Sequence, residues 1–189
     1  MAEACFPRIG ILSNPIIYNL LLILGGSLFI SLTAQLAFRL PFTPVPITMQ
    51  TFGVLLIGLT YGSKRGALTL VAYLAEGAMG LPVFANGGCG IAYLCGPTGG
   101  YLFGFVVAAF VIGYLAENGW DRKMLTAFAA MLIGTIVLFA FGLLGLSRFV
   151  GEDKLFVAGL IPFIPGEIFK SILVAISLPT AWKVLIKKF

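Results

Sequence analysis

The chain of 189 residues contains no histidine, and its three cysteines stand far apart or alone at positions 5, 89 and 95. Without histidine and without clustered thiols, a catalytic histidine, a zinc site or a haem site is not expected, so we predict no metal and no cofactor. The sequence has no visible pair of a nucleophile and a base, and the GPTGG segment at 96–100 lacks the Lys-[Ser/Thr] ending of a phosphate-binding loop. We therefore predict that the chain is not an enzyme and does not itself hydrolyse ATP.

Charge is also scarce, because charged residues make up 10% of the chain whereas hydrophobic residues make up 60%. A soluble domain of this length does not bury so much apolar surface in one core. The net charge is +5, but the twelve Lys and Arg residues stand singly or in pairs between apolar runs and form no basic stripe of the kind that binds nucleic acid. We predict a multi-pass protein of the cell membrane, or of the inner membrane where there are two, in contact with the lipid bilayer and with no nucleic-acid partner.

Six apolar segments are long enough to be membrane helices, although two of them are short for a hydrocarbon core about 30 Å thick. The sequence therefore predicts an all-α bundle of six transmembrane helices in a single domain, 1–189. The expected helices are about 16–38, 47–61, 66–81, 101–116, 124–146 and 165–186. No small-residue cleavage pattern follows the first residues, so we expect the first helix to remain in the bundle.

The distribution of basic residues predicts the orientation of the bundle, since cytoplasmic loops carry an excess of Lys and Arg. Eight of the twelve would lie on the side of the two termini: Arg8, Lys64, Arg65, Arg122, Lys123, Lys183, Lys187 and Lys188. Three would lie on the opposite side, namely Arg39, Arg148 and Lys154, and Lys170 lies within a helix. Both termini are therefore expected in the cytoplasm.

The loops expected on the outer side contain nearly all of the unusual sequence. The first, 39–48, has three prolines within six residues, which prevents helix and favours a stiff, extended segment. The second, 80–101, has seven glycines, two prolines and no charge. Irregular, apolar backbone is tolerated at membrane depth only where it packs in protein or lines a cavity. The pattern suits a protein that captures a solute from outside.

Glu167 and Lys170 are two charges one helical turn apart within the last apolar segment. Charges in a membrane helix are costly, so they usually mark a functional site. Their spacing places both on one face of the helix. The alternative interpretation is a structural ion pair that allows two charges to share a buried helix.

Four sequence blocks resemble, in the same order, the BioY family, the biotin-binding membrane subunits (S components) of energy-coupling factor (ECF) transporters. The blocks are PFTPVPITMQTFGVLLIG, GSKRGALTLVAYLAEGAMGLPVFANGG, GPTGGYLFGFVVAAFVIG and PFIPGEIFK, which cover most of 41–113 and 162–175. The resemblance implies a six-helix membrane protein that binds biotin near its outer face. It also implies a partner module of a coupling membrane protein and two ABC ATPases, which would supply ATP hydrolysis for vitamin uptake.

Biotin offers a neutral ureido group with two N–H donors and a carbonyl, an apolar bicyclic body, and a carboxylate on a flexible tail. With this ligand in view, Glu167 is expected to accept from a ureido N–H and Lys170 to donate to the ureido oxygen. The family usually has Asp where this chain has Glu167. The added methylene keeps the acceptor but shifts its reach by about one bond.

Four further residues complete the expected substrate site. Asn86 can both donate to and accept from the ureido group, or it can simply form the turn before two glycines. Arg39 is placed where a carboxylate tail would emerge, or it can be an interfacial anchor. Tyr93 and Phe42 are candidates for the apolar sleeve, although aromatic residues of membrane proteins often serve in packing.

Some alternatives stay open at the level of sequence. Thr48 and Gln50 lie near the same mouth or cap the second helix. Glu76, in the third helix, can line the cavity, bind a cation or pair with Arg39, and it is not counted as a ligand. Cys89 and Cys95 can form a disulfide or remain free thiols. The same type of subunit for another vitamin, and a stand-alone facilitator or ion-coupled carrier, are the alternative functions.

Overall fold

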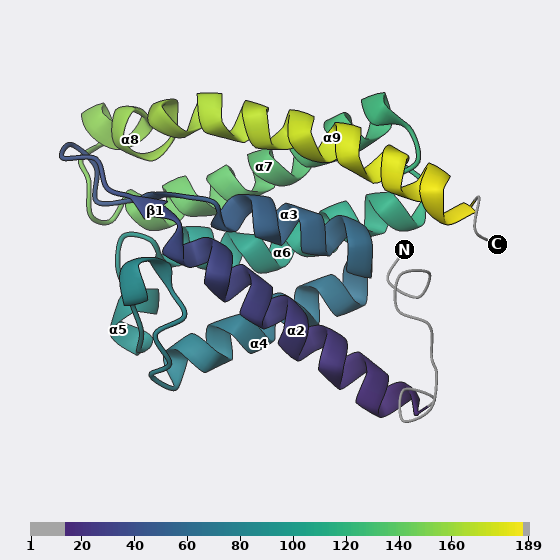
Figure 1. Ribbon diagram of the computed structural model, residues 1–189. Helices are drawn as coiled ribbons and strands as arrows, with labels where there is room; N and C mark the ends of the chain where they lie inside the picture. The colour runs from purple at the N-terminus through teal and green to yellow at the C-terminus, as the bar shows by residue number, and fades with distance from the viewer. Residues whose placement is uncertain (1–13, 187–189) are drawn as a thin grey trace.

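The computed structural model describes the backbone of residues 14–186 and the side chains of residues 14–178. Six helices have twelve residues or more in this part of the chain: α2 (Pro15–Gln35), α3 (Gln50–Tyr61), α4 (Ser63–Ala78), α6 (Gly99–Glu117), α7 (Met124–Leu146) and α9 (Ile164–Ile186). Shorter elements occupy the connections: β1 (Ala37–Phe38), β2 (Ile47–Thr48), η2 (Ala85–Gly87), α5 (Ile91–Leu94), α8 (Glu152–Gly159) and η3 (Ile161–Phe163). The all-helical class is confirmed, and each expected segment overlaps one of the six helices (Figure 1).

The first two helices are shorter than predicted because a small β-hairpin lies between them. β1 and β2 pair antiparallel, with Ala37 opposite Thr48 and Phe38 opposite Ile47. Helix α2 therefore ends at Gln35 instead of near 38, and α3 begins at Gln50 instead of 47. The proline segment between the strands forms no helix, as the sequence predicted, but it turns at 41–42 and bends at 44–45 instead of running extended throughout. The strand residues are mostly apolar, so the hydropathy pattern assigned them to the ends of the neighbouring helices.

The third helix lies three residues earlier than predicted. Gly62 has a φ of +82° and makes a sharp turn directly after α3. The carboxylate of Glu117 accepts from the backbone N–H of Ser63 at 2.8 Å and so fixes the start of α4 there. At the other end, Gly80 has a φ of +100° just after α4, a conformation that glycine adopts without strain and that often ends a helix. The structure also adds helix α8, which the sequence analysis placed in a loop.

Helix length and composition allow several of these helices to cross a membrane. Among the described residues, α2, α6, α7 and the run from Glu152 to Leu178 are long and apolar enough to do so, and α3 is apolar but shorter. Side chains along one side of α2 are largely exposed, at four-residue spacing: Ile16, Leu20, Leu24, Leu28, Leu32 and Leu36. In a bilayer such a stripe lies against lipid tails.

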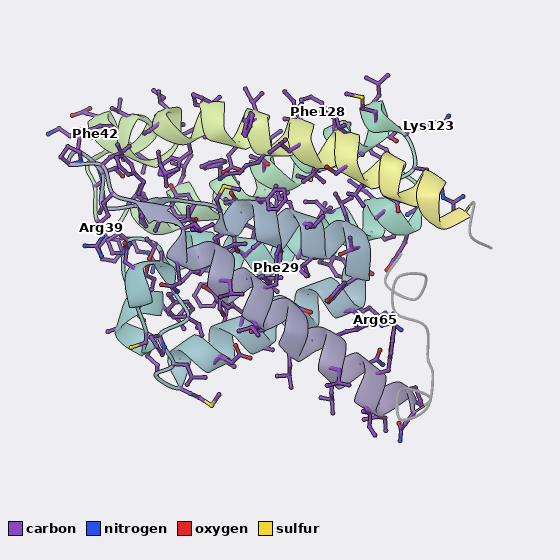
Figure 2. The ribbon with its side chains drawn as sticks, in the orientation of Figure 1. Phe29, Arg39, Phe42, Arg65, Lys123 and Phe128 are labelled. Carbon is purple, nitrogen blue, oxygen red and sulfur yellow. The ribbon has the colours of Figure 1, made fainter. Side chains whose placement is uncertain are left out.

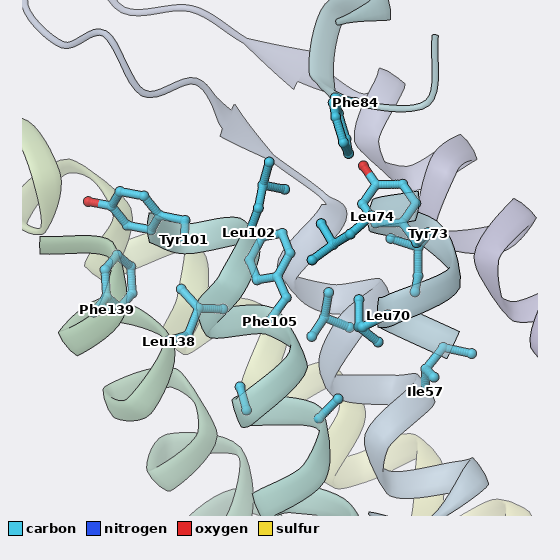
Figure 3. Packing of buried hydrophobic residues seen from close by; sticks show 14 of the residues in the cluster. Ile57, Leu70, Tyr73, Leu74, Phe84, Tyr101, Leu102, Phe105, Leu138 and Phe139 are labelled. Carbon is cyan, nitrogen blue, oxygen red and sulfur yellow. The ribbon is translucent and has the colours of Figure 1, made fainter. Parts of the chain in front are cut away.

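Helix α6 lies at the centre of the bundle and packs against α3, α4 and α7. Figure 3 shows how its side chains Tyr101, Leu102 and Phe105 meet Tyr73 of α4 and Phe139 of α7. The α6–α7 contact is close because two glycines face each other, since a Cβ at Gly100 would lie only 2.8 Å from the Cα of Gly145. Helix α2 packs across α3 and α4, and α9 packs on α7 and α3.

The irregular connections and the short turns lie at opposite ends of the bundle, as the sequence predicted. In Figure 1 the hairpin, α5 and α8 gather at the left end, whereas the α3–α4 and α6–α7 turns lie at the right. Figure 2 shows Arg39 and Phe42 at the first end, and Arg65 and Lys123 at the other. Arg8, Lys187 and Lys188 lie outside the described residues, as does the side chain of Lys183. The cytoplasmic position of the termini stays a prediction.

The close α6–α7 contact can be tested with two Gly→Ala variants. Gly100→Ala is expected to destabilise the protein by about 1–3 kcal/mol, because the new methyl overpacks the contact with Phe141 and Gly145. Gly25→Ala is the matched control, since nothing lies within 4 Å of its Cβ position on α2. Thermal unfolding in detergent measures both variants. Equal midpoints for the two would contradict the described packing.

Candidate ligand-binding site

Two adjoining pockets lie at the end of the bundle that carries the hairpin. The inner one, of about 50 Å³, is lined by Val45, Pro46, Thr48, Gln50, Thr51, Ala85, Tyr93, Thr98, Tyr101, Leu102, Phe105, Leu138, Phe139, Phe163 and Glu167. The outer one, of about 290 Å³, is lined by Arg39, Pro44, Pro46, Asn86, Ala92, Tyr93, Gly96, Pro97 and Thr98. Pro46, Tyr93 and Thr98 belong to both, so the two pockets adjoin and share part of their walls.

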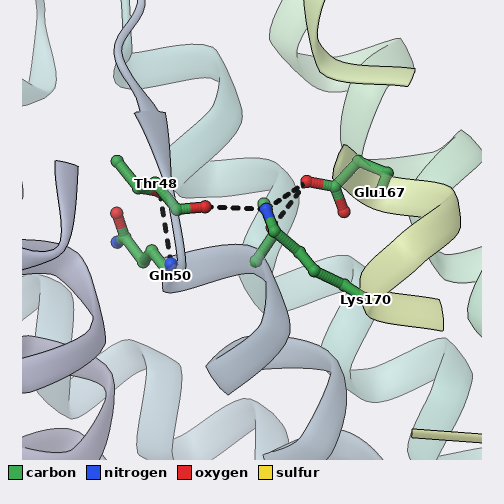
Figure 4. A network of polar contacts seen from close by, with 5 residues as sticks. Thr48, Gln50, Glu167 and Lys170 are labelled. Atoms are coloured by element: carbon green, nitrogen blue, oxygen red, sulfur yellow. Dashed lines mark hydrogen bonds and ion pairs between the residues drawn. The ribbon is translucent and has the colours of Figure 1, made fainter. Parts of the chain in front are cut away.

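Glu167, which lines the inner pocket, and its neighbour Lys170 are both buried, at 5% and 4% exposed. Lys170 Nζ donates to Glu167 Oε1, to Thr51 Oγ1 and to the carbonyl oxygen of Thr48, each at 2.7 Å (Figure 4). An ammonium has three protons, so these bonds use all of them. Within the described residues, Lys170 is also not part of the lining of either pocket.

Glu167 differs from Lys170 because one of its oxygens is left over. Its Oε1 accepts from Lys170 and from Thr51 Oγ1, both at 2.7 Å. Its Oε2 is buried and has no hydrogen-bond partner in the described part of the chain, and Glu167 lines the inner pocket. A buried, unpaired carboxylate oxygen is costly unless a donor reaches it. Lys170 therefore binds only groups of the protein, whereas Glu167 can still accept a hydrogen bond from a donor.

A second polar group of the inner pocket is the side-chain amide of Gln50, which is 3% exposed. Its Nε2 donates to the hydroxyl of Tyr73 at 2.9 Å, and that hydroxyl donates to the carbonyl of Val83 at 3.0 Å. This chain fixes the amide and leaves its oxygen as an acceptor. Thr48 Oγ1 accepts from the backbone N–H of Gln50 at 3.2 Å, and Thr48 also lines the inner pocket, so it lies both at the start of α3 and at the site.

Tyr93 forms the boundary between the inner and outer pockets. Its ring stacks on Phe84 with centroids 5.0 Å apart, and Phe84 in turn meets Tyr73 edge to face at 5.4 Å. Burial raises the pKa of the Tyr93 phenol, although a hydrogen bond with Thr98 and the charge of Arg39 act in the opposite direction. Tyr93 is thus a neutral, well-supported wall in the position of the expected sleeve.

The remaining predicted residues fall into two groups. Arg39 and Asn86 are both exposed and both line the outer pocket. Asn86 has a φ of +57°, so it also forms the turn that the alternative interpretation described. Phe42 is 59% exposed and is not among the residues that line either pocket, so the structure does not bring it to the site.

The open alternatives for Glu76 and the cysteines are also answered in part. The carboxylate of Glu76 accepts a hydrogen bond from Ser27 Oγ of α2, and Glu76 lines neither pocket. Cys89 and Cys95 are exposed free thiols, so they do not form the disulfide considered above. Cys5 lies outside the described residues.

The sequence did not single out Thr51 or Thr98, and it placed Gln50 near the mouth of the site only as one of two alternatives. Thr51 is one residue after Gln50 at the start of a helix, a place where a polar residue is normally explained by capping. Its contact is with Glu167, 116 residues further along the chain. No local pattern carries that information.

The BioY family model matches residues 9–187 of this chain. A probable biotin transporter BioY of Pyrococcus horikoshii is 40% identical over 148 residues, which cover 77% of this chain and 86% of that protein. A biotin transporter BioY of Thermotoga maritima is 41% identical over 138 residues, covering 72% and 80%. The crystal structure of an S-component for biotin from an ECF-type ABC transporter superposes with a TM-score of 0.80 at 28% identity, covering 90% of this chain and 93% of that one.

The dependence of Glu167 on Lys170 gives a stability prediction. Lys170→Met should destabilise the protein by about 3–5 kcal/mol, because it leaves a buried carboxylate without its ion pair. Glu167→Gln combined with Lys170→Met should recover most of this loss, since no charge is then buried. Denaturant unfolding in detergent measures the wild type and both variants. A double variant as unstable as Lys170→Met would show that the pairing described here is not what holds the pair in place.

Proposed function

Because this chain belongs to the BioY family, we propose that it is the biotin-binding membrane subunit, the S component, of an ECF-type ABC transporter. The protein is a transporter subunit and not an enzyme. The observation that supports its ligand most directly is the unpaired, buried Oε2 of Glu167, a residue that lines a pocket with aromatic walls. A ureido N–H is a neutral donor that satisfies such an oxygen without bringing a second charge into the membrane.

We propose that the two acceptors of the inner pocket divide the two ureido N–H groups between them. Glu167 Oε2 would accept one and Gln50 Oε1 the other, while Tyr101, Phe139 and Phe163 cover the bicyclic rings. Lys170 would act through Glu167, since its three protons are already used. The donor to the ureido oxygen would then be Lys170 only if it released Thr48 or Thr51.

The tail of biotin would extend past Tyr93 into the outer pocket. There Arg39 is the cation, and Asn86 is a neutral polar group of the same pocket. This orientation places the charged end of the ligand near water and the neutral head in the protein, which is the arrangement with the smaller desolvation cost.

The inner pocket has to widen before a bicyclic head group fits, because about 50 Å³ is well below the roughly 300–1,000 Å³ of typical ligand sites. Val45 and Pro46 of the first loop form part of its wall. That loop is tied to the end of α8 by Thr43 Oγ1, which donates to the carbonyl of Ala158 at 2.6 Å. We propose that the proline-stiffened loop moves as a unit when biotin enters.

Uptake by this subunit would need partners. The chain has no phosphate-binding loop, so ATP hydrolysis would come from two ABC ATPases joined to it by a coupling membrane protein. We further propose that all six long helices cross the cell membrane with both termini in the cytoplasm, which places the pockets on the outer side. This agrees with the position of the hairpin, α5 and α8 at one end of the bundle.

The role of Glu167 is tested by calorimetric titration of biotin into the purified protein. Glu167→Gln should weaken binding by about tenfold or more, because a charged acceptor contributes about 1.5–3 kcal/mol to a hydrogen bond. Leu173→Ala is the control, since Leu173 lies on the same helix with its side chain partly exposed. A folded wild type that does not bind biotin would overturn the proposed function, and unchanged binding by Glu167→Gln would overturn the role of this residue.

Arg39 is tested with a pair of ligands that differ only at the tail. Arg39→Ala should weaken the binding of biotin by about tenfold, the order expected for loss of a charged hydrogen bond. The same substitution should hardly change the binding of biotin methyl ester, which has no carboxylate. Competition against labelled biotin measures both ligands. An equal loss for biotin and its ester would mean that Arg39 shapes the pocket without recognising the carboxylate.

A further inference from the structure

Gln35, the last residue of α2, connects this helix to the segment that carries Asn86. Its Nε2 donates to the carbonyl of Phe84 at 3.1 Å and to the carbonyl of Ser31, on its own helix, at 3.3 Å. Its Oε1 accepts from the backbone N–H of Gly87 at 3.0 Å. One amide thus binds the chain on both sides of Asn86, 49 and 52 residues further along.

The turn that Gln35 binds has an unusual backbone. Asn86 and Gly87 both have left-handed φ values, +57° and +71°. The turn is closed by the N–H of Phe84, which donates to the carbonyl of Gly88 at 3.0 Å, and by the N–H of Gly88, which donates to the carbonyl of Ala85 at 3.2 Å. A left-handed asparagine carries a conformational cost, so it persists where surrounding contacts hold it.

The turn is held to the bundle by ring packing before Asn86 and by a hydrogen bond after it. Before Asn86, the fully buried ring of Phe84 packs between Tyr73 and Tyr93. After Asn86, Gly87 has no side chain, and its N–H is bound by Gln35. Gln35 itself lines neither pocket. Its hydrogen bond to Gly87 holds the backbone directly after Asn86, which lines the outer pocket.

We propose that Gln35 is a positioning residue for ligand capture, which acts by holding Asn86 at the wall of the outer pocket. This inference rests on the proposed function, because it assumes that Asn86 faces bound biotin. Without Gln35 the turn keeps its own hydrogen bonds but loses its connection to α2. Bound ligand would then leave faster, while the helical bundle keeps its stability.

The test is a double-mutant cycle on biotin binding, with rates from labelled biotin. Gln35→Ala should raise the dissociation constant by about tenfold, mainly through the dissociation rate. Asn86→Ala should weaken binding as well, and adding Gln35→Ala to it should cost little more, since the residue that Gln35 positions is already gone. Leu36→Ala, next to Gln35 with an exposed side chain, is the matched control and should bind as the wild type does.

Two further readouts separate positioning from a general structural role. The unfolding midpoint of ligand-free Gln35→Ala should equal that of Leu36→Ala, and amide exchange should become faster at 85–88 in Gln35→Ala alone. Wild-type affinity in Gln35→Ala, or additive losses in the double variant, would overturn the inference while leaving biotin binding intact. Absence of biotin binding by the wild type would instead overturn the proposed function, and with it the role of Gln35 in capture.

Discussion

The buried Lys170 ammonium is the group on which the candidate site depends. A bilayer offers no water to hold such a charge, so the protein has to supply every hydrogen bond. Here the bonds come from the carbonyl of Thr48, the hydroxyl of Thr51 and the carboxylate of Glu167. They join α9 to the strand and helix at the opposite wall of the pocket, and they leave one carboxylate oxygen without a partner. Stability and recognition therefore meet in one cluster.

The same requirement explains how irregular backbone is tolerated at the pocket end of the bundle. Side chains of the long helices satisfy carbonyl groups of the connections there. Tyr73 donates to the carbonyl of Val83, Gln35 to that of Phe84, and Tyr101 to that of Gly159 at 2.7 Å. The glycine-rich segment 80–101 is thus held from α2 and α4, and the end of α8 from α6, in agreement with the expectation that such backbone packs in protein or lines a cavity.

Hydropathy was enough to predict the six helices, because apolar runs and the turns between them are local features. The end of α2 and the start of α3 were beyond it, since β1 and β2 are as apolar as the helices they adjoin. In the site, the rarity of membrane charges pointed to Glu167 and Lys170, and the chemistry of the ligand that the family resemblance implies pointed to Arg39, Asn86 and Tyr93. Lys170 donates its hydrogen bonds within the protein, and Thr51 and Gln35 also have their main partners far away in the sequence. No spacing rule reveals such contacts.

The bond from Lys170 to the carbonyl of Thr48 has a consequence for how the first loop and the ligand influence each other. Thr48 ends the hairpin strand that follows Val45 and Pro46, and Lys170 holds both Thr48 and the carboxylate at the head of the pocket. Suppose that a ligand bound to Glu167 favours closure of the first loop over the pocket. Closure of the loop must then favour ligand binding by the same free energy. If the first loop closes over the ligand as proposed, occupancy and closure are reciprocally linked, and either one measured alone reports on the other.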